Sequence, residues 1–460
     1  MKFNKNILRE ADIRGVYPDE VNSDFANALG KVFGSFVLEN KENAVVVGHD
    51  NRFGGPDLTK NLIEGLISTG VNVHYIGLVT TPMLNYASRK LANCYGIMVT
   101  ASHNPTNYNG FKLFGKEYQH CSHEELDVIY NNLINFDKFK PRVSKVLGHI
   151  NFLDIDASYV KYVQNKINPG NRHLKVVIDC GNGTASTIVR RIYDKLPFNV
   201  TYIYSDSDPR FPNHHPDPNV KANLVDLCKK VVEVHADIGL AYDGDADRIG
   251  IVDEKGHVVD SDIMMAVMAP AILKEDNSKP ILIDVKCSNT LRDTIKYYNG
   301  TYIETTPSSA REEQIVHEQN LNFGGGYSNH IFFHDSHPGY DDGIYAGLRF
   351  HEYLTHTNAK LSELVKVLPK YYNTEEIKVK TTDEKKWKVV TGVKEYADLH
   401  KYTYETIDGI KVIKKNSWAL VRASNTGPNL TLRFEATTKR DLKLIQNEFM
   451  EVVGILNQMK

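Results

Sequence analysis

The feature that most constrains the fold is an alternation of short apolar runs with helix-length stretches along the first 285 residues. The apolar runs are 44–47, 71–76, 96–99, 176–178, 238–241 and 281–285, and the helix-like stretches are 24–39, 57–69, 223–234 and 262–274. Such alternation is typical of parallel or mixed sheets covered by helices. Because 460 residues exceed what one hydrophobic core normally supports, we expect several α/β domains.

The pattern changes after about residue 370. Segments 375–380, 410–413, 418–422 and 429–436 read as antiparallel strands, and a helix over 439–456 ends the chain. This region therefore predicts an α+β module. Earlier, the run at 176–178 leads into Asp-Cys-Gly-Asn-Gly at 179–183. A lone Gly-x-Gly also occurs in nucleotide phosphate loops, but it is a weak signal, and we interpret it as the start of a second α/β unit.

Composition excludes some partners. The chain has 55 basic and 57 acidic residues, a net charge of −2, and thus no general attraction to nucleic acid or membrane. It has no run of about 20 apolar residues and no apolar signal-peptide segment near its start. Five cysteines without a Cys-x-x-Cys pair point to a reducing compartment. We expect a cytoplasmic protein that binds neither nucleic acid nor membrane.

Three carboxylates, Asp243, Asp245 and Asp247, follow the apolar run at 238–241. If the chain stays extended, they lie on one side, because strand side chains alternate. They repel one another unless a cation lies between them. Oxygen ligands suit Mg²⁺, which usually keeps a phosphate oxygen in its shell. A solvated acidic turn is an alternative, and so is a calcium loop, although that loop requires glycine where this chain has Arg248.

A serine lies at the end of another strand-like run. Residues 100–105, Thr-Ala-Ser-His-Asn-Pro, follow the apolar stretch 94–99, and the proline restricts the residue before it to extended backbone. The Ser102 hydroxyl is thus well placed to carry a phosphoryl group. On this pattern alone, an ordinary polar turn is the commoner explanation.

Taken in order, the motifs resemble the α-D-phosphohexomutase family, in particular its phosphomannomutase/phosphoglucomutase branch. The resemblance rests on Arg-Glu-Ala-Asp-Ile-Arg-Gly at 9–15, Val-Gly-His-Asp-Asn-Arg at 47–52, residues 100–105 with Tyr-Asn-Gly-Phe-Lys at 108–112, Phe-Pro-Asn-His-His-Pro-Asp-Pro at 211–218, Asp-Gly-Asp-Ala-Asp-Arg at 243–248, Asp-Val-Lys-Cys at 284–287 and Arg-Ala-Ser-Asn-Thr at 422–426.

This resemblance implies the architecture. We expect three tandem α/β domains with mixed sheets and a C-terminal α+β domain, arranged around a central cleft. The expected boundaries lie near residues 150, 255 and 370. The domains would be 1–150 with the phosphoserine loop, 151–255 with the metal loop, 256–370 with the sugar-binding loop and 371–460 with the phosphate-binding loop.

It also implies roles for individual residues. Ser102 would carry the phosphoryl group, and a Mg²⁺ ion would be held by Asp243, Asp245, Asp247 and the phosphorylated Ser102. The other expected catalytic residues are Arg14, Lys112, Arg248 and His330. The expected substrate-binding residues are Lys286, Ser328, Arg422, Ser424, Asn425 and Thr426.

The implied activity is the interconversion of hexose 6-phosphate and hexose 1-phosphate through phosphoserine and a bisphosphate intermediate, with sugar 1,6-bisphosphate as activator. Mannose phosphate is the first expected substrate, and glucose phosphate the second. Alternatives are a mutase for another phosphosugar, such as glucosamine or an unusual hexose or heptose phosphate, a catalytically silent phosphosugar-binding protein, and a phosphatase. The partner is a small phosphosugar, and the chain would be a monomer or dimer.

The sugar side departs from the family pattern. Ala11 stands where the family has tyrosine, Ser308 where it has histidine, and Gly326 where it has the glutamate that contacts sugar hydroxyls; Gly427 replaces glutamate or threonine. A site that loses a hydrogen-bonding partner discriminates differently. We therefore expect altered sugar selectivity, with Tyr327 and Asn329 as replacement contacts. Gly326→Glu should shift activity towards mannose or glucose phosphate, provided the loop backbone tolerates a side chain there, which a glycine at φ > 0 would not.

Overall fold

The computed structural model of the chain describes residues 3–91, 94–116, 119–424 and 427–459. The chain forms two compact units. The first comprises Met1–Ser261, Glu313–Phe323 and Ser328–Leu364, and the second comprises Asp262–Glu312, Gly324–Tyr327 and Val365–Lys460.

The first sheet of the first unit has six strands in the order β1-β5-β4-β2-β3-β6. They are β1 (Asp12–Val16), β5 (Tyr108–Phe114), β4 (Tyr95–Val99), β2 (Ala44–His49), β3 (Asn72–Leu78) and β6 (Ile150–Phe152). The pairs β1-β5 and β5-β4 are antiparallel, whereas β4, β2, β3 and β6 are parallel, so the sheet is mixed.

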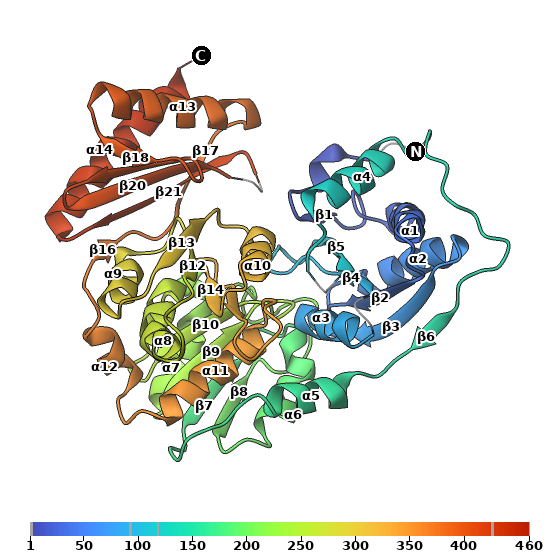
Figure 1. Ribbon diagram of the computed structural model, residues 1–460, viewed down its shortest axis with the longest axis horizontal. Coiled ribbons are helices and arrows are strands. Elements are labelled where there is room, and N and C mark those ends of the chain that lie inside the picture. The colour runs from blue at the N-terminus through green and yellow to red at the C-terminus, as the bar shows by residue number, and fades with distance from the viewer. Residues whose placement is uncertain (1–2, 92–93, 117–118, 425–426, 460) are drawn as a thin grey trace. The chain divides into compact units, whose positions relative to one another are not determined.

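Helices cover this sheet because their apolar residues recur every three or four positions. They are α1 (Ser23–Glu39), α2 (Gly55–Ser68), α3 (Thr81–Lys90) and α4 (His123–Ile134). Phe25, Leu29 and Phe33 of α1 share one core with strand residues such as Val45 and Ile97. The Asn22 side chain begins α1 by accepting the Phe25 N–H, and Thr80 does the same for α3 through Met83. Figure 1 shows α1 and α2 side by side next to β2 and β3.

The second sheet of this unit has the order β11-β10-β9-β7-β8. Its strands are β11 (Val258–Val259), β10 (Ile249–Asp253), β9 (Ile238–Tyr242), β7 (Lys175–Asp179) and β8 (Asn199–Ile203). The pairs of β10 with β9 and β11 are antiparallel, and β9, β7 and β8 are parallel. The unit also contains η1 (Lys5–Ile7), α5 (Asp156–Gln164), η3 (Thr184–Thr187), α6 (Val189–Tyr193), η4 (Lys221–Leu224), α7 (Val225–Glu233), β15 (Ile331–Phe333) and α11 (Gly343–Thr355), and α12 (Leu361–Lys366) begins within it.

In the second unit, β12 (Ile281–Asp284) pairs in parallel with β13 (Tyr302–Thr305) and, through Gly324 and Gly325, with β14 (Phe323–Gly325). The helices of this region are α8 (Ser261–Glu275), α9 (Asn289–Tyr297) and the start of α10 (Ser309–Glu318), whose residues from Glu313 onward belong to the first unit. Asp284 thus ends a fully buried strand, and Gly326 directly follows the neighbouring strand.

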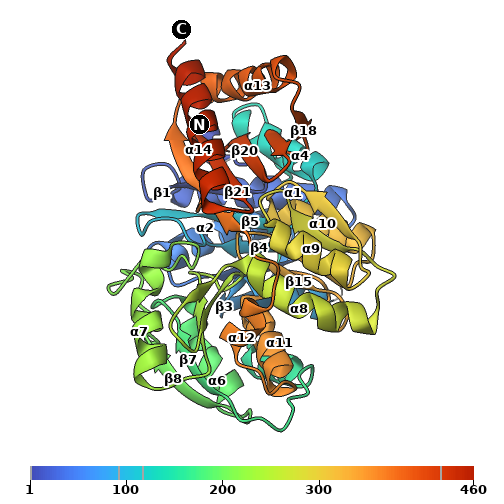
Figure 2. The ribbon, with the colours of Figure 1, turned by 90° about the vertical axis from the view of Figure 1, so that its left-hand side faces the viewer.

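The C-terminal part of the second unit is an antiparallel sheet with the order β16-β21-β20-β19-β18, and β17 also pairs with β21. Its strands are β16 (Tyr372–Asn373), β17 (Ile377–Lys380), β18 (Thr403–Glu405), β19 (Ile410–Lys414), β20 (Ser417–Ala423) and β21 (Asn429–Ala436). Helices α13 (Asp383–Leu399) and α14 (Lys439–Gln458) lie together on one side of the sheet (Figures 1 and 2) and bury Val393 and Phe449 against it.

The predicted fold class is confirmed: the chain has α/β domains with mixed sheets and a C-terminal module with an antiparallel sheet. The sequence analysis did not identify helix α13, because it considered only the strand-like segments and the final helix of that region. It also did not identify β1, in which charged residues interrupt the apolar pattern. Within the described residues, no helix is both long and apolar enough to cross a membrane.

Candidate active site

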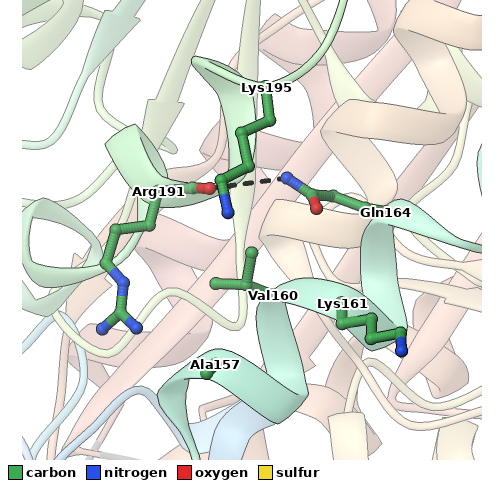
Figure 3. A pocket seen from close by; sticks show the side chains of 6 residues that line it. All are labelled: Ala157, Val160, Lys161, Gln164, Arg191 and Lys195. Carbon is green, nitrogen blue, oxygen red and sulfur yellow. Dashed lines mark hydrogen bonds between the residues drawn. The ribbon is translucent and has the colours of Figure 1, made fainter.

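A cavity of about 340 Å³ lies beside α5 and just after α6 in the first unit (Figure 3). Its lining residues are Ala157, Val160, Lys161, Gln164, Arg191 and Lys195. Gln164 donates to the Ile192 carbonyl oxygen (2.8 Å), and Arg191 pairs with the Asp156 carboxylate. None of the predicted site residues is among the described residues that line this cavity; they lie in the loops at the ends of the strands instead.

Ser102 lies in the loop between β4 and β5, in a strained backbone conformation. Its φ is 49°, in the left-handed region that residues other than glycine rarely adopt. The Ser102 N–H donates to Thr100 Oγ1 (2.8 Å), and the Thr100 hydroxyl donates to Asp50 Oδ2 (2.6 Å). Such conformations persist where the surrounding structure imposes them, and they cluster at functional sites.

The Arg52 side chain donates several hydrogen bonds to the same loop. Its guanidinium donates to the backbone carbonyls of Ser102, Asn104 (2.6 Å) and Pro105 (2.8 Å), and only 2% of the residue is exposed. Burial lowers the pKa of Arg52, and Asp50 opposes this effect. The sequence analysis quoted Arg52 only as part of a motif, because no local pattern reveals a side chain that bonds three carbonyls 50 residues away.

The Ser102 hydroxyl contacts the acidic loop between β9 and β10. Ser102 Oγ donates to Asp243 Oδ2 (2.6 Å). This loop does not stay extended: it turns, and Ala246 has a φ of 63°. The carboxylates converge through this turn rather than through strand alternation. A Cβ at Gly244 would lie 2.4 Å from the Ser102 carbonyl oxygen, so only glycine lets the two loops approach so closely.

The three aspartates form a buried cluster that fits a metal ion. Asp243, Asp245 and Asp247 are at most 2% exposed, and each offers an oxygen within 4.8 Å of the others. This burial excludes the solvated acidic turn. No described residue donates a hydrogen bond to Asp245 Oδ1 or Asp247 Oδ1, although both atoms are buried. An all-oxygen donor set with two such atoms fits a hard cation such as Mg²⁺.

Lys112 places a positive charge against this cluster. Its ammonium group donates to Asp245 Oδ2 (2.7 Å) and to Asp247 Oδ2, and Thr81 Oγ1 also donates to Asp245 Oδ2 (2.6 Å). Burial lowers the pKa of Lys112, but the two carboxylates outweigh it, so the pKa is raised. Burial and the neighbouring carboxylates raise the pKa of Asp243 well above its usual range. Burial also acts to raise the pKa of Asp245, but Lys112 reverses the effect and lowers it.

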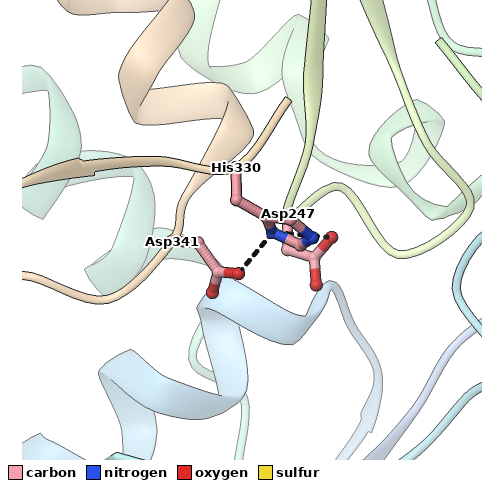
Figure 4. Close-up of side chains that lie close together, drawn as sticks. All are labelled: Asp247, His330 and Asp341. Carbon is pink, nitrogen blue, oxygen red and sulfur yellow. Dashed lines mark hydrogen bonds and ion pairs between the residues drawn. The ribbon is translucent and has the colours of Figure 1, made fainter. Parts of the chain in front are cut away.

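His330 and Asp341 form a second buried group beside Asp247 (Figure 4). Asp341 Oδ2 lies 2.6 Å from His330 Nδ1, and Arg248 Nε donates to His330 Nε2 (2.9 Å). Because a guanidinium only donates, Nε2 is the acceptor and Nδ1 carries the proton that is donated to Asp341. Both ring nitrogens are thus engaged, Nδ1 as donor and Nε2 as acceptor, so the ring of His330 is held in one orientation. The sequence analysis did not single out Asp341.

Arg14 and Ser328 are also in the first unit. Arg14 Nη1 donates to Asn104 Oδ1 (2.6 Å) in the serine loop, and Arg14 Nε donates to Asp12 (2.7 Å). The Ser328 carbonyl accepts a long hydrogen bond from Asn219 (3.4 Å). Three predicted catalytic residues thus meet at the serine loop and the acidic loop. Ser102 and Lys112 contact the acidic cluster, and Arg14 contacts the serine loop.

The second unit holds the other predicted cations. Lys286 pairs with Glu376 (2.9 Å), and Arg422 donates to the Asp408 carboxylate. Burial raises the pKa of Glu376, but Lys286 and Arg422 outweigh burial and lower it. Glu376 is a contact that the sequence analysis missed.

Two of the predicted phosphate-binding residues, Asn425 and Thr426, lie outside the described residues. Ser424 precedes them, and its carbonyl oxygen accepts a hydrogen bond from the Lys386 ammonium group (2.9 Å).

Comparisons with known proteins give the family. The descriptions "Phosphoglucomutase/phosphomannomutase, alpha/beta/alpha domain I", "II" and "III" match residues 5–138, 157–256 and 260–372, and "C-terminal domain" matches 376–452. A phosphomannomutase/phosphoglucomutase of Pseudomonas syringae pv. tomato is 38% identical over 96% of this chain and 94% of its own length. A phosphoglucomutase of Neisseria meningitidis serogroup A is 32% identical over 98% and 97%.

A solved structure of a phosphoglucomutase/phosphomannomutase family protein from Burkholderia thailandensis superposes with a TM-score of 0.90 at 31% identity, over 99% of this chain and 98% of that one. The chain belongs to the phosphoglucomutase/phosphomannomutase family, the α-D-phosphohexomutases. It is an enzyme, an intramolecular phosphotransferase with phosphohexomutase activity. The family is metal-dependent, and membership implies a phosphosugar substrate. The buried aspartate cluster is therefore the candidate metal site.

Proposed function

We propose that this enzyme interconverts hexose 6-phosphate and hexose 1-phosphate, with mannose phosphate as its main substrate and glucose phosphate as a second one. The observation that carries the proposal is the 2.6 Å hydrogen bond from Ser102 Oγ to Asp243, inside a buried group that also contains Asp245, Asp247 and Lys112. A hydroxyl in this setting is positioned to accept and release a phosphoryl group.

In the first half-reaction, the free hydroxyl of the substrate attacks the phosphorus of phosphorylated Ser102. An oxygen–phosphorus bond to the sugar forms as the bond to Ser102 Oγ breaks. His330 is the candidate base: Asp341 holds its Nδ1 proton, and Nε2 takes the proton of the attacking hydroxyl once Arg248 Nε has turned from Nε2 to the phosphoryl oxygens. The balance closes when this proton is passed on to Ser102 Oγ as the bond from Oγ to phosphorus breaks, and the product is a sugar bisphosphate.

Charge neutralisation is the main demand of such a transfer. Bound Mg²⁺, held by Asp243, Asp245 and Asp247, would supply positive charge at the phosphoryl oxygens. Lys112, Arg14 and Arg248 contribute further positive charge from the first unit.

In the second half-reaction, the bisphosphate presents its other phosphate to Ser102. Lys286, Arg422 and Ser424, with Asn425 and Thr426, grip the phosphate that does not react. A site that contacts the phosphate and not the sugar accepts either end of the intermediate. Free sugar 1,6-bisphosphate would act as activator, because it can rephosphorylate Ser102.

A panel assay tests the proposal. Purified protein with Mg²⁺ and glucose 1,6-bisphosphate is given mannose, glucose and glucosamine 1-phosphates, and the 6-phosphates are quantified. Intact-mass measurement then follows the added phosphate on parent and on Ser102→Ala. Turnover of mannose 1-phosphate with phosphate on Ser102 supports the proposal, and turnover of glucosamine 1-phosphate alone would replace it with the alternative sugar.

One observation favours a mutase for another phosphosugar as the second candidate. Gly326 and Ser308 remove side chains that the resemblance places at the sugar, whereas the aspartate cluster and Ser102 are complete. This completeness argues against a silent binding protein. We also propose domain boundaries near residues 150, 255 and 370, which the matched family ranges support.

A further inference from the structure

The start of helix α3 is joined to the acidic loop by two hydrogen bonds. Thr81, the first residue of α3, donates its backbone N–H to the Asp245 carbonyl oxygen (3.0 Å) and its hydroxyl to Asp245 Oδ2 (2.6 Å). Both residues are fully buried. A single residue, 164 positions earlier in the chain, thus contacts both the main chain and the side chain of Asp245.

The residues on either side of Thr81 suit this contact. The Thr80 side chain caps the helix by accepting the Met83 N–H, and Pro82 has no N–H that needs a partner. The Thr81 N–H is one of the donors at a helix start that have no acceptor within the helix. Because the positive end of the helix dipole lies at the same place, a carboxylate is favoured there. The local sequence therefore favours a bond between α3 and an acidic loop.

The two carboxylate oxygens of Asp245 have different surroundings. Oδ2 accepts the Thr81 hydroxyl and the Lys112 ammonium group (2.7 Å), whereas Oδ1 is buried and has no donor among the described residues. A carboxylate that accepts two bonds on one oxygen cannot rotate without breaking at least one of them. The donors on Oδ2 therefore fix the orientation of the group and leave Oδ1 for a cation.

We propose that Thr81 is a positioning residue for the metal, whose hydroxyl orients the Asp245 carboxylate so that Oδ1 is presented to Mg²⁺. The inference rests on the Mg²⁺ site of the proposed function. Partners that hydrogen-bond a ligating carboxylate hold it in the orientation that the metal needs, and their loss weakens metal binding. Since Thr81 acts through Asp245, the loss of its hydroxyl should weaken Mg²⁺ binding more than it slows the reaction at saturating Mg²⁺.

The main test compares Thr81→Val and Thr81→Ser with the parent. Valine keeps the branched shape of threonine and lacks the hydroxyl, whereas serine keeps the hydroxyl. Thr59→Val is the matched control, because Thr59 is also buried in the first unit but donates its hydroxyl to the Gly55 carbonyl of its own helix (2.7 Å). Intact mass confirms that Ser102 is unphosphorylated in every protein, and calorimetry with MgCl₂ then gives the Kd.

We expect Thr81→Val to raise the Kd for Mg²⁺ about tenfold to a hundredfold, and Thr81→Ser and Thr59→Val to stay close to the parent. The Mg²⁺ concentration that gives half the maximal rate should rise with the Kd, while kcat at saturating Mg²⁺ falls far less. A lower Tm with an unchanged Kd would show that the hydroxyl only supports the fold, and this result overturns the inference. A Kd as high in Thr81→Ser as in Thr81→Val would also overturn it.

Two features of the experiment keep its outcomes distinct. If Thr81→Val does not fold, Thr81→Ala takes its place beside Thr81→Ser, because both shorten the side chain and only serine keeps the hydroxyl. Calorimetry also requires no turnover. A parent that binds Mg²⁺ but converts no sugar phosphate contradicts the proposed function, and the comparison of Kd values still decides the role of Thr81. A parent that binds no Mg²⁺ contradicts the metal site and the role of Thr81 together.

Discussion

The acidic loop of the first unit and the β12 loop of the second both place aspartates at the end of a buried strand, Asp243 directly after β9 and Asp284 as the last residue of β12, yet their carboxylates bind different partners. Asp284 is saturated by three backbone N–H groups. Asp245 and Asp247 receive side-chain donors on one oxygen each and no donor from the described residues on the other. The comparison teaches that the donors around a buried carboxylate, rather than its position in the fold, decide whether it holds the backbone or a cation.

The largest effect on activity should come from Ser102, whose hydroxyl contacts the acidic loop. Ser102→Ala removes the oxygen that carries the phosphoryl group, so kcat should fall on the order of 10⁴-fold or more. Steady-state kinetics and intact mass measure this result. Ser186→Ala, in a serine outside the loop, is the control. Turnover close to that of the parent would contradict the phosphoserine mechanism.

Metal removal should distinguish the two loops directly. Treatment with EDTA should lower activity roughly 10³-fold or more until Mg²⁺ is restored, because the phosphoryl charge then lacks its strongest neutralising partner. Asp245→Asn should bind less Mg²⁺, whereas Asp284→Asn should keep the parent metal content and lose thermal stability instead. Metal analysis and melting curves of both variants check this. If Asp284→Asn lost the metal and Asp245→Asn kept it, the comparison would be reversed.

The next effect concerns recognition in the second unit. Arg422→Ala removes a guanidinium proposed to grip the non-reacting phosphate, so kcat/KM should fall about tenfold to a hundredfold with every active sugar. The loss should not depend on which sugar is used. Kinetics on the same sugar panel test this, and a loss confined to one sugar would place Arg422 at the sugar ring instead.

The smallest effect concerns Asp342, the neighbour of Asp341. Burial raises its pKa to about 7, from an ordinary value near 4. As pH rises from about 4 to about 7, the unfolded chain ionises while the native chain keeps the proton, so this group progressively destabilises the fold. Asp342→Asn, which can still cap α11, should reduce the fall in Tm between pH 5 and pH 8 by a few degrees.

Melting curves across this pH range make the measurement, with Asn substituted for the exposed Asp19 as control. A variant at Asp342 whose profile parallels that of the parent would mean that the buried carboxyl group does not titrate in this range.

The sequence indicated the fold and much of the chemistry because both depend on local patterns. Apolar periodicity gave the α/β alternation, and Ser102 with the three aspartates stood in short motifs with a chemical meaning of their own. Thr81 was out of reach because its partner, Asp245, is 164 residues away in the chain. Asp341 is only 11 residues from His330, but no local motif pairs the two side chains. The expected obstacle to a side chain at Gly326 was a positive φ, which the glycine does not adopt; a Cβ there would instead lie 2.5 Å from Asp284 Oδ2, and only the packed structure shows this.

Arg52 gives the serine loop an unusual kind of order. The segment from Ser102 to Pro105 is irregular in secondary structure, yet one buried side chain holds three of its carbonyls. Such a segment cannot fray residue by residue, since releasing one carbonyl leaves the guanidinium in place on the others. Its amides should therefore exchange with solvent in a single cooperative opening, at a rate closer to that of the sheet than to that of surface loops.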